Sequence, residues 1–198
     1  MESSMNKTKE ILSWVIPILV GFAIAMVIKT FWITTVRVDG SSMYPNLQNN
    51  ERIVELKTAS IKRNSVVIFN AYGVDKRPGV AKSTQYVKRV IGMPGDQIEY
   101  KSNGQLYVNG HRQSQSYISK KEQTSGTLDL QLPAAKDVTL GTGHIFTVPK
   151  GEYFVLGDHR SVSNDSRYYG FVKRSKITGV AKVFFWNKKK SVINSYPQ

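Results

Sequence analysis

The chain begins with a long apolar segment and continues as short apolar runs separated by turn residues. Residues 11–28 read ILSWVIPILVGFAIAMVI and hold no charged side chain. About 20 apolar residues in a helix, rising about 1.5 Å each, span a bilayer core of about 30 Å. Trp14 and Trp32 lie near the two ends, where amphipathic rings favour the membrane interface. The pattern predicts one transmembrane helix over residues 11–33, from which the Lys29 side chain can extend outward.

Two other kinds of segment resemble a membrane span. A cleaved secretory signal has an apolar region of about 7–15 residues followed by a small-residue cleavage site. The run in this chain is longer, and no Ala-x-Ala-like site follows it. A buried core helix is the second alternative, and the length of the run argues against it. We therefore expect a retained membrane anchor.

The orientation of this anchor is predicted from its flanking charges. Lys7 and Lys9 precede the span, and acidic residues count little in the positive-inside rule. Long following domains cross the membrane largely regardless of their charge. We expect residues 1–10 in the cytoplasm and residues 34–198 outside it.

Residues 34–198 alternate short β-favouring runs with turn signals. The runs are 52–56, 65–69, 86–92, 97–100, 105–108, 144–148, 153–156 and 177–186. Asn103-Gly104 between two runs predicts a hairpin over 97–108. No amphipathic helix is evident after residue 34. Several short strands with close turns favour an all-β domain, a mostly antiparallel barrel or sandwich.

One segment departs from this pattern. Residues 111–143 are rich in Gln, Ser, Thr, Lys and Gly and contain few apolar positions. The segment is interpreted as a variable insertion, a flexible excursion from the β core. The basic cluster 187–190 is typical of a solvated chain end.

Composition narrows the possible chemistry. The 198 residues predict one domain with an appendage, and the absence of cysteine excludes disulfides, thiolate zinc sites and a cysteine nucleophile. Three scattered histidines offer little to a metal ion. The formal net charge is +14, and all but +1 of it lies after residue 33. Such an excess favours an anionic partner: nucleic acid, phospholipid head groups or cell-wall polymer.

Three segments carry candidate chemistry. They read GSSMYPNL at 40–47, YVKRVIGMPGD at 86–96 and GDHRSVSNDSRYYGFV at 157–172. A serine in a Gly/Pro loop is by itself a common turn residue. Lys88 lies inside an apolar run, where strand alternation puts it on the same face as Tyr86 and Val90. Alone it could equally be an edge-strand lysine whose charged end reaches solvent.

Taken together, the segments suggest a serine nucleophile with a lysine base. A serine hydroxyl is a poor nucleophile until a neighbouring group removes its proton. A free lysine amine is only about 0.04% neutral at pH 7, and burial lowers its pKa. A pKa of about 8 would require about 3 kcal/mol of differential solvation. The hypothesis therefore needs an apolar pocket around Lys88 without an adjacent carboxylate, and residues 76–95 contain no Asp or Glu.

The anchor and the three motifs, in this order, resemble bacterial type I signal peptidases of the Gram-positive, single-span kind. The resemblance covers nearly the whole chain except residues 111–143. It implies an all-β, membrane-bound serine endopeptidase that needs no metal or cofactor. Its partners would be exported preproteins, cut after small residues in an Ala-x-Ala-like pattern. It would act as a monomer beside anionic lipid, without nucleic acid.

The same resemblance implies a role for individual residues. Ser42 matches the family's nucleophile, Lys88 its general base and Ser163 the hydroxyl that orients the lysine. Residues that would brace the site by ion pairs are Asp158, Asp165, Arg167 and Arg89. Residues that would line the shallow substrate pockets are Met43, Leu47, Tyr86 and Val87. The backbone N–H of Ser42 would serve the oxyanion hole.

The sequence departs from the family pattern at three positions. Asn46 stands where threonine is usual, and His159 stands where asparagine is common. Gly40 lacks the hydroxyl that some relatives add to the oxyanion hole, which leaves that second donor in doubt. Ser41 is an alternative nucleophile, but the motif register selects Ser42.

Three other functions are compatible with parts of the sequence. A Ser-His-Asp hydrolase could use His159, but no G-x-S-x-G elbow is present. The charge of residues 34–198 suggests nucleic-acid binding, but serine–lysine repressors carry a DNA-binding helical domain where this chain has an apolar span. The third is an anchored binding module with an inactive serine–lysine pair.

Overall fold

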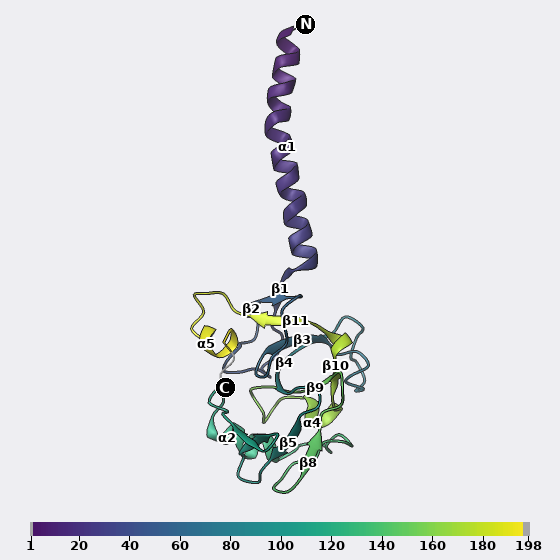
Figure 1. The fold of residues 1–198 in the computed structure, drawn as a ribbon, viewed down its shortest axis with the longest axis vertical. Coiled ribbons are helices and arrows are strands. Elements are labelled where there is room, and N and C mark those ends of the chain that lie inside the picture. Colours follow the sequence, from purple (N-terminus) through teal and green to yellow (C-terminus); the bar gives the residue numbers. More distant parts are fainter. Residues whose placement is uncertain (1, 196–198) are drawn as a thin grey trace.

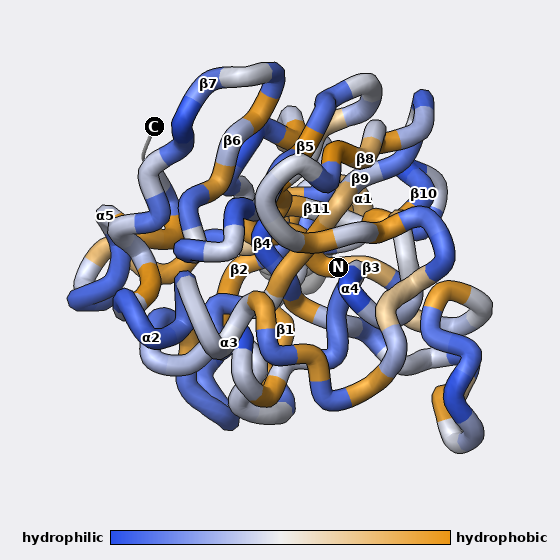
Figure 2. The backbone as a smooth tube through the Cα atoms, turned by 90° about the horizontal axis from the view of Figure 1, so that it is seen from below, coloured by the Kyte–Doolittle hydropathy of each residue, from blue (hydrophilic) through white to orange (hydrophobic). Residues whose placement is uncertain are grey.

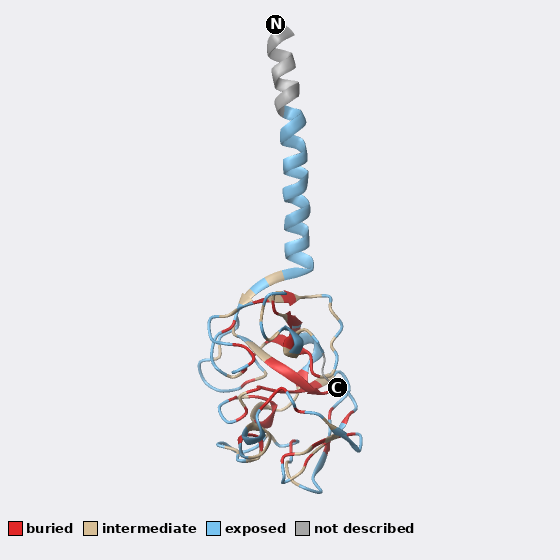
Figure 3. Cartoon of the chain, turned by 90° about the vertical axis from the view of Figure 1, so that its left-hand side faces the viewer, coloured by how far each residue is buried: buried red, intermediate tan, exposed pale blue. Residues whose placement is uncertain are grey.

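The computed structural model describes the backbone of residues 2–195 and the side chains of residues 12–195. One helix, α1 (Glu2–Phe31), stands clear of a β-rich domain (Figure 1). Within it, Leu12–Phe31 is long and apolar enough to cross a membrane, and none of that segment is buried (Figure 3). The expected cytoplasmic segment 1–10 lies outside the described side chains, and residues 196–198 lie outside the described chain.

The domain is built from two antiparallel sheets. The larger has the order β1-β2-β11-β3-β4-β9-β10 and the smaller has the order β7-β6-β5-β8. The strands of the larger sheet are β1 (Ile33–Arg37), β2 (Arg52–Leu56), β3 (Val66–Asn70), β4 (Gln85–Gly92), β9 (Glu152–Leu156), β10 (Val172–Lys173) and β11 (Ile177–Lys182). Those of the smaller sheet are β5 (Gln97–Tyr100), β6 (Leu106–Val108), β7 (His111–Gln113) and β8 (Ile145–Thr147). The predicted all-β, mostly antiparallel class is confirmed.

In the described residues after α1, helical structure is limited to single turns. These are α2 (Lys120–Gln123), α3 (Ser125–Leu128), α4 (Ser166–Tyr169), the 3₁₀ turn η1 (Arg174–Lys176) and α5 (Lys190–Ile193). In Figure 2 the apolar stretches follow the strands of the interior, and the polar stretches follow the outer loops. The core is thus formed by sheet faces, as the alternating runs predicted.

Each predicted run contains a strand, and the 97–108 hairpin is present as the antiparallel pair β5–β6. The predicted β run 177–186 is longer than the observed strand, because β11 ends at Lys182. Beyond it the Asn194 side chain bonds to both the N–H and the carbonyl of Val183, at 2.8 Å each. These bonds satisfy groups that a neighbouring strand would otherwise pair with.

Strand β1 was missed because it continues the apolar segment. The helix ends at Phe31, so the predicted anchor 11–33 overran into the sheet. Ile33 pairs with Leu56 of β2, and the Trp32 carbonyl accepts the N–H of Lys57 at 3.0 Å. The helix therefore passes into the sheet without a linker. Strands β7 and β10, of three and two residues, were also missed.

Residues of the insertion 111–143 pack in the core, which argues against a flexible excursion, whereas a variable insertion stays a prediction. Tyr117, Ile118 and Val138 are buried in the same core cluster as Ile98 of β5. The segment has few apolar residues, but those few face the core.

Polar residues of the insertion are buried around Arg160, which is 1% exposed. The guanidinium forms none of the ion pairs found among the described side chains. It donates to the Thr127 hydroxyl at 2.9 Å and to the Gly157 carbonyl at 2.9 Å. Further acceptors lie 3.3–3.4 Å away in Tyr100, Tyr117 and Gln115. A buried cation is thus solvated by neutral groups, most of them from the insertion.

Thr127→Val should destabilise the fold while keeping the shape of the side chain. The change removes an acceptor from Arg160 and a hydrogen bond from the Thr127 hydroxyl to the Glu122 carbonyl. We expect the free energy of unfolding to fall by about 1–3 kcal/mol, measured by urea denaturation of the detergent-solubilised protein. Thr139→Val, at an exposed position of the same segment, is the matched control. Equal stability of the two variants would contradict a structural role for the Arg160 shell.

Candidate active site

The loop after β1 presents Ser42 from a tight turn. The Tyr44 N–H bonds to the Ser41 carbonyl, and the Leu47 N–H bonds to the Met43 carbonyl. Met43 and Leu47 are 1% and 0% exposed and pack in the core with Ile53. They are not among the residues that line the cleft beside Ser42, so a contact of Met43 and Leu47 with substrate stays a prediction. Their burial instead fixes the turn that carries the serine.

Lys88 reaches this serine from the middle of β4. Its backbone pairs with Val67 of β3, and its side chain is buried, with 3% of the residue exposed. The ammonium nitrogen Nζ lies 2.7 Å from Ser42 Oγ. Nζ also lies 5.2 Å from the centre of the Tyr86 ring, on the same face of the strand. None of the ion pairs among residues 12–195 includes Lys88.

Burial lowers the pKa of Lys88 from about 10.5 to about 8. The negative charges of Asp165 and Asp158 raise this pKa and offset part of the effect, while Arg167 and Arg77 lower it. At a pKa of about 8, about a tenth of the amines are neutral at pH 7. The amine is therefore poised to accept a proton near neutral pH.

Two buried arginines engage the two aspartates nearest the lysine. Arg89 bonds to Asp158 through Nε at 2.8 Å and Nη2 at 2.7 Å. Arg167 bonds to Asp165 through Nε at 2.8 Å and Nη2 at 3.0 Å. All four side chains are fully buried. Because each carboxylate is already paired, neither forms an ion pair with Lys88, and the amine keeps its lowered pKa.

Asn46 and His159, two of the residues that differ from the family motif, form hydrogen bonds close to Ser42. Asn46 Nδ2 donates to Asp158 at 2.9 Å and to the Tyr117 carbonyl at 2.6 Å, so this amide joins the ion pair to the insertion. The backbone N–H of His159 donates a hydrogen bond to the Ser42 carbonyl at 3.0 Å, and His159 Nδ1 lies 3.2 Å from the Ser41 carbonyl oxygen. The imidazole contacts the Ser41 carbonyl and the Tyr44 ring rather than Ser42 Oγ, and the adjacent Asp158 is bound by Arg89. The geometry of a Ser-His-Asp triad is not formed here.

Ser163 is buried close to Ser42, on the other side of Gly157. Its hydroxyl has no hydrogen-bond partner among the described side chains, so the structure shows no bond that orients Lys88. Ser163 packs against Gly157, where a β-carbon would collide with the Ser163 side chain and the Ser42 carbonyl. Only glycine allows these segments to lie so close.

Ser42 and Lys88 open into a cleft of about 500 Å³. Tyr86 and Val87 line it, as the motif suggested. Sequence reasoning missed further lining residues, namely Val36, Arg77, Val162 and Asn164. Val36 could have been predicted to line the cleft if β1 had been recognised. Arg77 lies in a loop whose sequence has no motif that would indicate a place in the cleft. Among the described residues, no group of three or more His, Asp or Glu side chains could hold a metal ion.

An all-β domain that brings a serine hydroxyl to a buried lysine amine has the arrangement of a serine–lysine hydrolase. A family model for signal peptidase, peptidase S26, matches residues 11–186. The chain belongs to this signal peptidase family.

Individual relatives agree with the family. Signal peptidase IB of Staphylococcus aureus (strain COL) is 38% identical over 188 residues, covering 90% of this chain and 91% of the relative. Signal peptidase I P of Bacillus subtilis subsp. natto is 35% identical over 190 residues, covering 93% and 94%. A crystal structure of a signal peptidase I from Enterococcus faecalis V583 is 30% identical, covers 62% of this chain and 97% of that chain, and has a TM-score of 0.43.

The protein is therefore a peptidase that removes signal peptides, and exported preproteins are its substrates. Its apolar N-terminal helix is that of a membrane-anchored enzyme.

Asp158→Asn should show how strongly the buried pair supports the site. The substitution keeps the shape of the side chain but leaves the Arg89 guanidinium without its counter-ion in a fully buried position. We expect the free energy of unfolding to fall by about 3 kcal/mol, measured by urea denaturation. Asp129→Asn, at an exposed position, should change it little. If both substitutions have the same small effect, the pair does not hold the site together.

Proposed function

We propose that Ser42 is the nucleophile and Lys88 the general base of this signal peptidase. The observation that carries the proposal is the 2.7 Å approach of Lys88 Nζ to Ser42 Oγ in a buried environment. Neutral Nζ accepts the hydroxyl proton as Oγ attacks the carbonyl carbon of the scissile bond. The resulting oxyanion is stabilised by backbone N–H groups, including that of Ser42.

The remaining steps use the same two side chains. Protonated Lys88 gives its proton to the departing amine, which leaves as the new N-terminus of the mature protein. The signal peptide stays bound as an ester of Ser42. Lys88 then deprotonates a water molecule, which hydrolyses the ester and restores the free hydroxyl. The proton balance closes within the dyad, so this mechanism needs no metal or cofactor.

The surrounding residues are assigned supporting roles. The pairs Arg89–Asp158 and Arg167–Asp165 hold the loop behind Ser42 and keep their carboxylates away from the amine. Ser163 is proposed to orient Lys88 after rotation of its hydroxyl, which has no partner in the present geometry. Tyr86 and Val87 are proposed to contact the small side chains beside the scissile bond, because both line the cleft.

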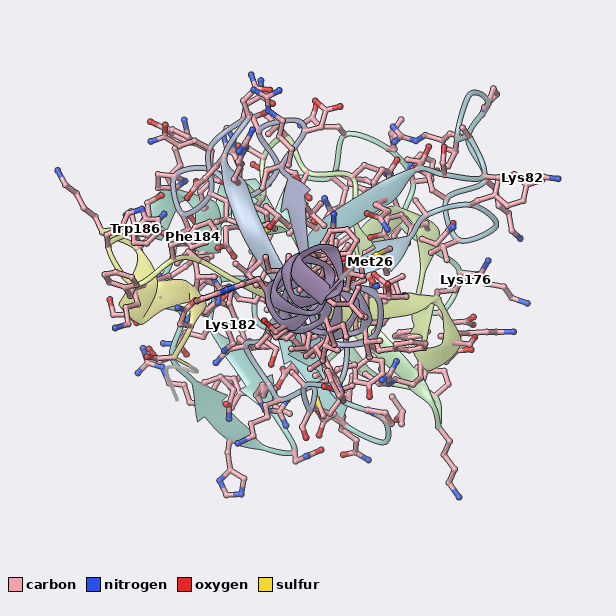
Figure 4. The ribbon with its side chains drawn as sticks, turned by 90° about the horizontal axis from the view of Figure 1, so that it is seen from above. Met26, Lys82, Lys176, Lys182, Phe184 and Trp186 are labelled. Atoms are coloured by element: carbon pink, nitrogen blue, oxygen red, sulfur yellow. The ribbon has the colours of Figure 1, made fainter. Side chains whose placement is uncertain are left out.

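The domain is proposed to lie against the outer face of the membrane. Residues 11–33 would form the anchor and its junction, with 1–10 in the cytoplasm and 34–198 outside. Figure 4 looks down α1 onto the domain and shows Phe184 and Trp186 on the loop that follows β11. Trp186 is 67% exposed, and a basic cluster follows it in the chain. Aromatic rings with adjacent lysines suit the interface of an anionic bilayer.

The pH dependence of cleavage tests the proposed base. Because only neutral Lys88 accepts a proton, kcat/KM should rise with pH, with a midpoint of about 8 and a plateau above it. Lys88→Ala and Ser42→Ala should each lower cleavage of a labelled preprotein by about 10⁴-fold or more. Activity would be measured on the detergent-solubilised full chain from pH 6 to pH 10.

Matched variants separate this dyad from its alternatives. Ser41→Ala, His159→Ala and the exposed Lys82→Ala should retain most of the activity. Loss of cleavage in His159→Ala would indicate a histidine-dependent mechanism instead. Unchanged cleavage in Lys88→Ala would refute the proposed base.

The membrane contact is tested by the fluorescence of Trp186. In anionic proteoliposomes, brominated lipid should quench the emission that distinguishes the wild type from Trp186→Phe. Trp14 and Trp32 are present in both proteins and cancel in the comparison. The quenching should weaken when the lysines at 188–190 are replaced by glutamine, because the attraction to anionic lipid is lost. A Trp186 signal insensitive to brominated lipid would show that the loop does not contact the bilayer.

A further inference from the structure

A second hollow lies beside the cleft that contains the dyad. It has a volume of about 720 Å³. Its walls come from the β3–β4 loop at 74–78, the insertion at 132–137 and the turn α4 with the residues after it. The proposed mechanism assigns no role to the side chains that form these walls, although a volume of this size is typical of binding sites.

The two hollows are adjacent and share two lining residues. Arg77 and Asn164 line both of them. These two residues are held by Asp75, whose carboxylate accepts from Asn164 Nδ2 at 2.7 Å and from Arg77 Nη2 at 2.9 Å. The same carboxylate accepts the Tyr86 hydroxyl at 2.8 Å. Asp75 is 4% exposed, so this junction is a fixed part of the site rather than a mobile surface loop.

The position of the helix indicates which part of a substrate would reach the second hollow. The cleft is lined by β1, which follows α1 directly, whereas α4, β9 and β10 lie farther from α1 (Figure 1). A signal peptide has its apolar segment in the membrane and approaches from the side of α1. The chain beyond the scissile bond must then leave on the side away from α1, where the second hollow begins.

The lining of the hollow suits a polypeptide of variable sequence. Lys136 and Asp137 bring both signs of charge, and Leu132, which is 52% exposed, brings an apolar surface. Tyr169 also lines the hollow, and its hydroxyl is buried without a partner among the described side chains. An incoming peptide group could supply that partner.

We propose that this second hollow binds the mature segment of the preprotein, in extended form, over the residues that follow the scissile bond. The inference rests on the proposed function, because it assumes that the chain is cut at Ser42. Binding of this segment would hold the leaving amine near Lys88 and favour substrates that continue into a mature protein. A peptide ending just after the scissile bond would lack these contacts.

The test varies the length of the substrate on each side of the cut. One pair of peptides shares the same signal-side sequence and carries either two or eight residues after the scissile bond. A second pair differs only in the length of the signal side. For the wild type we expect kcat/KM of the longer peptide of the first pair to be higher by about tenfold, mainly through a lower KM. Leu132→Trp, which fills the hollow, should reduce this gain to less than about twofold and leave cleavage of the short peptide unchanged.

Two further variants control the comparison. Lys136→Trp blocks the hollow from another exposed position of the same segment and should also abolish the gain. Ile145→Trp introduces the same bulk at an exposed residue of β8, which does not line the hollow, and should preserve it.

The outcomes distinguish this inference from the function on which it rests. A length gain that persists in both Leu132→Trp and Lys136→Trp would overturn the mature-segment site. A gain that follows extension of the signal side and is lost in those variants would also overturn it, because the hollow would then hold the other end. If the wild type cleaves none of the peptides, the proposed function fails.

Discussion

The site depends on keeping one amine free of a counter-ion inside a region rich in charge. Lys88 is buried near two aspartates, either of which could form an ion pair with it and raise its pKa. Each aspartate is instead paired with an arginine through two hydrogen bonds. These pairs leave the Lys88 amine without a counter-ion, which is consistent with its lowered pKa. Replacing these pairs with apolar residues would remove the hydrogen bonds that position Gly157 and Asn46.

The insertion belongs to this arrangement. Its residues contact three buried arginines. The Thr127 hydroxyl accepts a hydrogen bond from Arg160, and the Gly126 carbonyl accepts one from Arg167. The Tyr117 ring packs on the Arg89 guanidinium, 4.3 Å from the ring centre. Since Arg160 also holds the Gly157 carbonyl, contacts of the insertion extend to the backbone beside Ser42. A segment whose sequence is mostly polar thus supplies the neutral groups that solvate buried arginine side chains.

The sequence was informative where local periodicity determines structure and less informative where tertiary contacts do. Alternating runs predicted most strands, and Asn103-Gly104 predicted a hairpin that is present. Strand β1 was hidden because its apolar residues continue those of the helix. The motifs indicated that Ser42 and Lys88 belong together, but a loop motif carries no information about side-chain direction, so it did not reveal that Met43 is buried in the core. The Asp75 junction joins Asp75 to Tyr86 and to Asn164, 89 positions away, and nothing local marks such a contact.

The direct passage of α1 into β1 has a geometric consequence. Trp32 is already hydrogen-bonded to the residue after β2, so the sheet begins where the helix ends. Five strand residues extend about 17 Å, and Ser42 follows a short loop beyond them. In the proposed arrangement the nucleophile therefore stands at a set height above the lipid. In that arrangement the enzyme would select the bond to be cut by its distance from the bilayer as well as by the side chains beside it. A bond after a small residue at a different distance from the bilayer would not be cleaved.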